Sequence, residues 1–299
     1  MNVFDIAAFL KSRQSGLGGS DIATLFGINP YSTKLELYFD KRGEIKPTGD
    51  TSLTRTGRAM EHVIAVMVAE REGAKLRKIN KTLRHPKHDY LIAHIDRDFV
   101  GIRKGLEIKN VSPRMAYLWG KDGQPDAVAE HYLPQPHHYM LVLDYDLFDV
   151  AAYFGGDDLR IYPMKRDPEM DELIIDAAHD FWHNHVLAGV PPEPDFEHKS
   201  TLPMLRRMYP GTNGQAVIAS ELDEALLYWA KVAEDAAEKA HQYETVAEQA
   251  RNHLLAAMGD AAVLRLDGRR AMVRKVIKRK AYEVAASSYV DARFTNLKG

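Results

Sequence analysis

The stretch GLEIKNV at residues 105–111 is the part of the sequence that most narrows the choice of fold. It has the alternation of a β-strand, in which successive side chains point to opposite faces, so Glu107 and Lys109 share one face. The apolar run YLIAHI at residues 90–95 is also typical of a strand, and Asp96 follows it. If the two strands pair in an antiparallel manner, Asp96, Glu107 and Lys109 meet at one point.

Two carboxylates and one ammonium group at a single point suit the hydrolysis of a phosphodiester. Carboxylate oxygens are ligands that Mg²⁺ and Mn²⁺ prefer, and a lysine beside them can act on the attacking water or stabilise charge that develops on the phosphate. A Glu-x-Lys pair on a strand is more often a solvated face. Here the apolar residues Leu106 and Ile108 indicate a buried strand, in which unpaired charge is costly unless a metal or another partner compensates it.

A third carboxylate, Glu61, belongs to a segment of helical composition over residues 55–70. At 100° per residue it shares a face with Val68 and other apolar side chains. A carboxylate is unfavourable there unless a cation meets it. We therefore expect Glu61 to serve the same site as Asp96 and Glu107; the alternative is an ion pair with Arg58 or His62 at the edge of the helix.

In chain order these residues resemble the pattern of the PD-(D/E)xK nucleases: a Gly-x-x-x-Glu helix, an Asp, a Glu-x-Lys strand and a Gln that opens a helix, here Gln135. GGSDIA at residues 18–23 and GINPY at residues 27–31 match the N-terminal signature of one family within that class. The chain thus resembles the YqaJ-type viral recombinases, whose relatives include the lambda-type phage alkaline exonucleases. The resemblance covers residues 10–195.

The resemblance implies a restriction-endonuclease-like α/β core, with a mixed central sheet flanked by helices. It also implies a Mg²⁺-dependent exonuclease, in which Mn²⁺ can substitute. Such an enzyme degrades one strand of linear double-stranded DNA from 5′ to 3′ and exposes single strands for an annealing protein in phage-type recombination. Two departures from the family pattern, Arg97 in place of Gly and His137 in place of Gln, remove no metal ligand.

The resemblance further assigns roles to individual residues. The metal ligands are Asp96, Glu107 and the carbonyl of Ile108. The catalytic residues are Lys109, Glu61 and Gln135, and the residues that bind the 5′-phosphate of a DNA end are Arg13 and Ser20. Lys109 would position the water, Glu61 would assist through a second metal or its water, and Gln135 would orient Lys109 or the DNA. Taken alone, Ser20 is as well explained as a helix cap, although a helix N-terminus also attracts anions.

Composition excludes several other classes of protein. The chain has 299 residues and no cysteine, so it has no disulfide, no thiolate zinc site and no cysteine-ligated iron–sulfur cluster. It has no apolar run long enough to span a bilayer and no N-terminal signal pattern. We therefore expect a soluble protein in the cytoplasm of a bacterial host cell, without a membrane partner.

A strongly basic segment lies near the end of a chain whose net charge is only −2. Residues 265–280 carry eight Lys or Arg and one Asp, and the Asp-Gly pair at 267–268 predicts a β-hairpin. Such a hairpin could follow the phosphates of DNA; equally, its charges could only protect an exposed edge strand. The candidates for contact with the DNA backbone are Arg269, Arg270, Arg274 and Lys275.

The organisation predicted along the chain is an exonuclease domain over 1–195, a Pro- and Gly-containing linker over 196–215 and an extension over 216–299. The extension begins with one long helix whose apolar residues recur in steps of four and three from Leu222 to Leu254. This heptad seam favours a homo-oligomer, but the helix could instead pack on another part of the same chain.

Two other functions remain compatible with the sequence. The first is an endonuclease of the same fold, which cuts DNA internally. The second is a non-catalytic DNA-binding or assembly module, in which the long helix and the basic hairpin are the functional parts. The intact carboxylate–lysine set counts against the second alternative.

Overall fold

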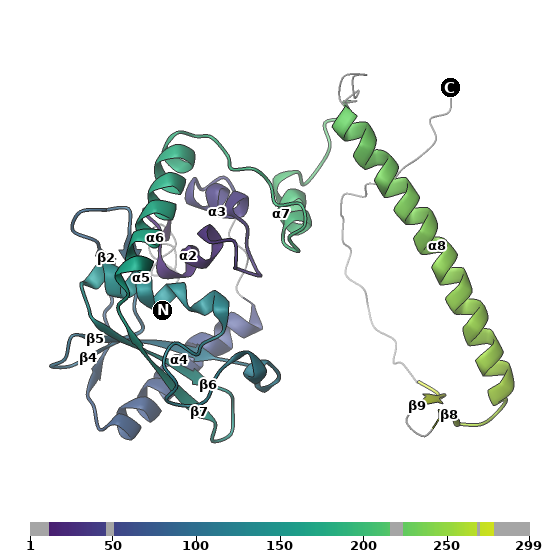
Figure 1. Ribbon diagram of the computed structural model, residues 1–299, viewed down its shortest axis with the longest axis horizontal. Coiled ribbons are helices and arrows are strands. Elements are labelled where there is room, and N and C mark those ends of the chain that lie inside the picture. Colours follow the sequence, from purple (N-terminus) through teal and green to yellow (C-terminus); the bar gives the residue numbers. More distant parts are fainter. Residues whose placement is uncertain (1–11, 46–50, 216–223, 268–269, 278–299) are drawn as a thin grey trace. The chain divides into compact units, whose positions relative to one another are not determined.

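The computed structural model describes residues 12–45, 51–215, 224–267 and 270–277. The chain divides into two compact units, Met1–Tyr209 and Pro210–Gly299 (Figure 1).

A five-stranded sheet forms the centre of the first unit, in the order β1-β4-β5-β6-β7. Its strands are β1 (Leu76–Arg77), β4 (Arg97–Phe99), β5 (Lys104–Asn110), β6 (Leu147–Tyr153) and β7 (Leu159–Lys165). The central pair β5–β6 is parallel, whereas the other neighbours are antiparallel. This mixed sheet with helices around it confirms the predicted restriction-endonuclease-like α/β core.

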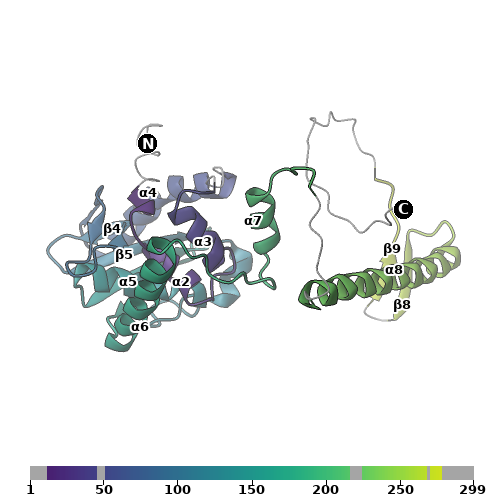
Figure 2. The same ribbon diagram turned by 90° about the horizontal axis from the view of Figure 1, so that it is seen from above.

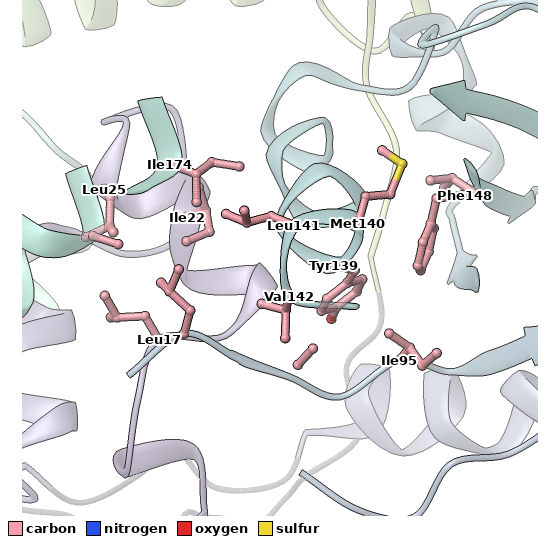
Figure 3. Packing of buried hydrophobic residues seen from close by; sticks show 14 of the residues in the cluster. Leu17, Ile22, Leu25, Ile95, Tyr139, Met140, Leu141, Val142, Phe148 and Ile174 are labelled. Carbon is pink, nitrogen blue, oxygen red and sulfur yellow. The ribbon is translucent and has the colours of Figure 1, made fainter. Parts of the chain in front are cut away.

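Helices cover both faces of the sheet, because each central strand buries side chains on both sides. On one face α4 (Ser52–Glu72) packs its buried residues, Ile64 among them, against Leu106 and Ile108 of β5. On the other face lie α2 (Gly19–Leu25), α5 (Pro134–Leu143) and α6 (Pro168–His179). Side chains of α5 there lie between those of α2 and Phe148 of β6 (Figure 3).

The face that β5 turns toward α5 is the one that carries Glu107 and Lys109. Since Leu106 and Ile108 point toward α4, the alternation predicted for residues 105–111 is confirmed. The crossover from β5 to β6 contains η1 (Pro113–Leu118), η2 (Glu130–Tyr132) and α5. The helix that supplies Gln135 is therefore part of the connection that the parallel pairing requires.

The strand predicted over 90–95 does not pair with residues 105–111. It is shortened to β3 (Ile92–Ala93), which pairs with β2 (Leu83–Arg84), and β4 takes the place beside β5. Asp96 lies between β3 and β4. The prediction was wrong about the partner strand because local alternation does not specify which strands pair.

The linker predicted over 196–215 contains a packed helix. Helix α7 (Thr201–Met208) buries Met204 to 1% exposure. The side chain of Arg207 in α7 also forms an ion pair at 2.6 Å with Glu36, which belongs to helix α3 (Lys34–Lys41). The first unit consequently extends to Tyr209, past the expected boundary at 195.

The second unit contains one long helix and a hairpin. Helix α8 (Glu224–Met258) is continuous (Figure 2), and Met258 is its one buried residue. The hairpin pairs β8 (Val263–Asp267) with β9 (Arg270–Val273) in an antiparallel manner, as predicted, while Gly268 of the turn predicted at 267–268 lies outside the described residues. Leu222, the first residue of the expected seam, also lies outside them. Of the helices in the described ranges, none has the length and apolar character that crossing a membrane requires.

Candidate active site

A hydrogen-bonded network joins β5 to the first turn of α5. The ammonium of Lys109 donates to Glu107 Oε1 at 2.7 Å and to Gln135 Oε1 at 2.8 Å. The amide of Gln135 donates to the same Glu107 oxygen at 2.7 Å and to the Tyr139 hydroxyl at 2.9 Å. The ammonium also lies 4.6 Å from the centre of the Tyr132 ring. Lys109 is thus held in one orientation from two elements.

Asp96 joins this network through the backbone. Its Oδ2 accepts a hydrogen bond from the Ile108 N–H at 2.8 Å. In a β-strand the N–H and C=O of one residue point toward the same neighbour, so the Ile108 carbonyl is directed to the side of Asp96. Asp96, Glu107 and the Ile108 carbonyl therefore converge.

The electrostatics of the two carboxylates indicate that a cation belongs between them. Desolvation, and then the charge of Glu107, raise the pKa of Asp96 well above its ordinary value. Glu107 is 5% exposed, and its Oε2 is buried without a hydrogen-bond partner among the residues that the structure describes. An orphaned carboxylate oxygen beside a second carboxylate is costly unless a cation is bound.

The residues present fit Mg²⁺ or Mn²⁺ with few protein ligands. Within the described part of the chain, no cluster of three or more His, Asp or Glu side chains could hold a metal ion by itself. The candidate site offers two carboxylates and one carbonyl. Mg²⁺ is suited to such a set, because it commonly takes one or two carboxylates and completes its octahedron with water and phosphate oxygens.

Glu61 is held apart from this network by cations. Its Oε1 accepts from Arg97 Nη1 at 2.5 Å and from Lys78 Nζ at 2.9 Å. Burial would raise the pKa of Glu61, but the hydrogen bonds and charges of Lys78 and Arg97 outweigh it and lower the pKa. The residue is close enough for its charge to contribute to the raised pKa of Asp96. Arg97, which replaces the glycine of the family pattern, thus anchors the carboxylate that was expected to assist the metal.

One cavity of about 170 Å³ connects the carboxylates to the N-terminal signature. Its lining includes Asp96 and Glu107, and also Arg13 and Ser20. The Arg13 side chain is 40% exposed, and its Nη2 donates to Ser20 Oγ at 3.3 Å. The structure therefore brings together the two sets of residues that the sequence analysis assigned to the metal and to a phosphate.

The glycines of the signature allow this approach. A side chain on Gly19 would place its Cβ 2.7 Å from a ring carbon of Tyr139 and 2.9 Å from Cγ of Gln135, so α2 can begin against α5 only with glycine there. The N-cap of α2 is Gly18, whose N–H donates to Asp21 Oδ2, and Ser20 already lies inside the helix. The explanation of Ser20 as a helix cap is therefore wrong.

Four polar side chains that line the cavity were not singled out from the sequence: Asp21, Lys41, His94 and Tyr139. Asp21 is part of the GGSDIA signature and could have been identified there. The position of Lys41 carries no such signal. It is in the last turn of α3, where an exposed lysine is ordinary, yet its side chain is 0% exposed.

The basic residues of the hairpin belong to the second unit. Arg274 and Lys275 are exposed, and Arg274 donates a hydrogen bond to the Gly259 carbonyl. Arg270 lies at the start of β9, and Arg269 lies outside the described residues. Their contact with DNA stays a prediction.

A mixed sheet flanked by helices, with an Asp, a Glu-x-Lys strand and a helical Gln close together, is the arrangement that the resemblance to the PD-(D/E)xK nucleases implies. The chain matches the model of the YqaJ-like viral recombinase domain over residues 8–146, and this is the family that its sequence resembles. It is 30% identical to the uncharacterized protein YqaJ of Bacillus subtilis over 212 residues, which are 70% of this chain and 65% of that protein. The chain thus matches less than two thirds of the length of this relative.

The fold is also similar to that of solved structures. The crystal structure of the alkaline exonuclease LHK-Exo from Laribacter hongkongensis superimposes with a TM-score of 0.51 at 14% identity, over 62% of this chain and 94% of that chain. The structure of LHK-Exo in complex with dAMP gives the same values. At this identity the similarity establishes the architecture.

Proposed function

We propose that this protein is a metal-dependent deoxyribonuclease that degrades one strand of linear double-stranded DNA from the 5′ end. The observation that carries the proposal is that one cavity is lined both by Asp96 and Glu107, to which Lys109 is hydrogen-bonded through Glu107, and by the Arg13–Ser20 pair. The first set suits phosphodiester hydrolysis, and the second suits a terminal phosphate. An enzyme with both on one cavity would act at an end.

Asp96, Glu107 and the Ile108 carbonyl would hold Mg²⁺, for which Mn²⁺ can substitute. When bound, the ion supplies Lewis acidity and offsets the negative charge at the scissile phosphate. Glu107 Oε2 is the oxygen that remains for it, since Oε1 already accepts from Lys109 and Gln135.

Lys109 would hold the attacking water and stabilise the developing charge as a cation. Burial alone would lower the pKa of Lys109, but the charge of Glu107 and its hydrogen bond outweigh burial and raise the pKa. The ammonium therefore stays protonated and acts as a hydrogen-bond donor. Gln135 would keep it aimed, because its carbonyl accepts from Lys109 and its amide is fixed by Glu107 and Tyr139.

Arg13 and Ser20 would bind the 5′-phosphate of the DNA end. A guanidinium makes charge-assisted, often bidentate hydrogen bonds to phosphate, and the hydroxyl of Ser20, which lines the same cavity, already accepts a hydrogen bond from Arg13. Glu61 would act indirectly, by holding the guanidinium of Arg97, which also donates to the backbone carbonyl of Asp96.

The two parts of the second unit would serve assembly and DNA engagement. Large apolar side chains of α8 are exposed, among them Leu226, Trp229 and Tyr243, and a second copy of the chain would cover them in a homo-oligomer. The hairpin side chains Arg274 and Lys275 would contact the DNA backbone. The enzyme would act in the cytoplasm of a bacterial host cell, where it would supply single strands to an annealing protein during phage-type recombination.

One digestion series tests the proposal against its alternatives. Linear duplexes labelled at either 5′ or 3′ end, with or without a 5′-phosphate, are incubated with and without Mg²⁺ beside a covalently closed circle. We expect Mg²⁺-dependent shortening of the 5′-ended strand and an intact circle. A cut circle would favour the endonuclease of the same fold. Binding without cleavage under any metal condition would favour the non-catalytic module.

A further inference from the structure

We propose that the buried ion pair between Asp21 and Lys41 is a positioning device. It would hold Arg13 and Ser20 as one unit, and it would thereby set how strongly the cavity prefers a phosphorylated DNA end to a hydroxyl end. The inference rests on the proposed function of the cavity, and it assigns the origin of end discrimination to residues that do not themselves touch the end.

Lys41 ties the end of α3 to the backbone of Arg13. Its Nζ donates to the Arg13 carbonyl at 2.8 Å and to Asp21 Oδ2 at 2.6 Å, and its side chain is 0% exposed. A buried ammonium with two fixed acceptors has little freedom to move. It therefore fixes the point from which the Arg13 side chain reaches toward the cavity.

Asp21 fixes the other half of the unit. Its Oδ2, which accepts from Lys41, also accepts from the Gly18 N–H at 2.8 Å. This bond caps α2 and sets the turn that presents Ser20. One carboxylate oxygen thus joins the start of α2 to Lys41, and through Lys41 to the backbone of Arg13.

The charges of Arg13, Asp21 and Lys41 explain why a lysine is needed at position 41. Asp21 Oδ1 lies 3.7 Å from Arg13 Nη2, which is beyond hydrogen-bond distance. Lys41 offsets the charge of Asp21, so the carboxylate does not bind Arg13 tightly. The three groups together carry a net charge of +1, and that charge is on the guanidinium that lines the cavity.

Stability alone does not account for this pair. Asp21 is 5% exposed, and burial would raise its pKa, but the charges of Lys41 and Arg13 outweigh burial and lower the pKa. The Asp21 carboxylate is therefore held in its charged form, and both side chains of the pair are buried. Buried ion pairs of this kind are often replaced by apolar residues with no loss of stability, which favours a task other than stabilisation.

The test is the double variant Asp21→Asn/Lys41→Met in the full chain. It removes one charge of each sign, so the net charge of the cavity does not change and no unpaired charge is left buried. Affinity is measured without divalent metal for duplexes with a 5′-phosphate and with a 5′-hydroxyl. We expect the ratio of the two affinities to fall by about ten-fold or more, since each lost charged hydrogen bond is worth about that factor, while affinity for the hydroxyl end is unchanged.

The pair Lys104 and Asp149 provides a matched control. The Lys104 Nζ lies 2.5 Å from Asp149 Oδ2, the Asp149 side chain is 2% exposed, and both residues line a different cavity of the first unit. The variant Lys104→Met/Asp149→Asn makes the same chemical change there. We expect it to keep the wild-type preference for a phosphorylated end, whatever its effect on melting temperature.

Each outcome decides between the proposals. A wild-type protein without preference for phosphorylated ends would overturn the assignment of Arg13 and Ser20 under the proposed function. A wild-type protein with this preference, and a folded double variant that retains it, would overturn the present inference alone. If the double variant does not fold, Asp21→Glu replaces it, because it keeps both charges and displaces the carboxylate by one methylene. Here too a lowered ratio is expected, and an unchanged ratio would contradict the role of the pair.

Discussion

The carboxylate of Asp96 accepts a hydrogen bond from the backbone N–H of Ile108 at 2.8 Å. Asp96 directly precedes the first residue of β4, whereas Ile108 lies within β5, which extends beyond its pairing with β4. The register pairs Arg97 with Leu106, so a longer β4 would satisfy this N–H with a backbone carbonyl. A side chain takes that place instead. The candidate metal site therefore lies in a gap of the sheet, and the gap directs the Ile108 carbonyl toward the two carboxylates.

Replacement of Lys109 by Ala should abolish cleavage while folding and DNA binding remain nearly intact. Loss of one electrostatic group that acts on the transition state typically costs roughly 10²–10³ in rate. The measurement is single-turnover digestion of a 5′-phosphorylated linear duplex. Lys165→Ala, at an exposed position on β7, is the control and should be as active as wild type. Wild-type rates for Lys109→Ala would remove the lysine from the mechanism.

Asp96→Asn and Glu107→Gln should lose metal binding as well as cleavage. Wild-type protein should melt at a higher temperature when Mg²⁺ or Mn²⁺ is added, because an ion that binds only the folded state stabilises it. Neither variant should show this shift. An equal shift in wild type and in both variants would place the ion elsewhere.

The metal-free protein should become more stable when Asp96 is replaced by Asn, and the gain should depend on pH. The folded pKa of Asp96 is raised well above 3.8, so the carboxyl contributes no penalty below its unfolded pKa and destabilises the fold as pH rises through the folded value. The melting temperatures of wild type and Asp96→Asn should therefore converge near pH 4 and separate at neutral pH. A constant difference across this range would contradict the shift.

Arg13→Met should slow the cleavage of DNA with a 5′-phosphate more than the cleavage of DNA with a 5′-hydroxyl. The guanidinium can form charge-assisted bonds to a phosphate that a hydroxyl cannot match. Cleavage rates on the two substrates provide the measurement, and Arg103→Met, whose exposed side chain pairs with Asp144, provides the control. If Arg13→Met slows both substrates equally, Arg13 is a general backbone contact.

Truncation after Gln215 should spare the active site and weaken assembly or DNA engagement. All candidate catalytic and metal residues lie in the first unit, which ends at Tyr209. We expect a lower mass in light scattering, lower processivity and a flatter dependence of binding on salt, if the hairpin neutralises phosphates. A truncated protein with unchanged mass, affinity and processivity would leave the second unit without any of these roles.

The residues of the candidate site were predictable where their signal is local. The alternation around Glu107 and Lys109 depends only on strand geometry, and Gln135 followed from the family pattern. The partner strand of β5 was not predictable, because pairing depends on the whole sheet. The burial of Lys41 was not predictable either, since its acceptors lie on Arg13 and Asp21, 28 and 20 residues away.

Helix α7 and the partners of Glu61 show the same limit. The Pro and Gly residues around 190–214 favour a linker locally, yet the ion pair between Arg207 and Glu36 and the burial of Met204 keep α7 packed against the first unit. The Glu61 carboxylate, on the apolar face of α4, was predicted to need a cation as a partner. Lys78 and Arg97, which supply it, come from other segments of the chain and not from the helix edge.

The close approach of Gly19 to both Gln135 and Tyr139 fixes the distance between the two ends of the cavity. The start of α2 carries the residues proposed to hold the DNA end, and α5 carries the glutamine that aims Lys109, so one wall sets the spacing between them. The length of the piece released in each step would then be measured from the terminus and not read from the bases.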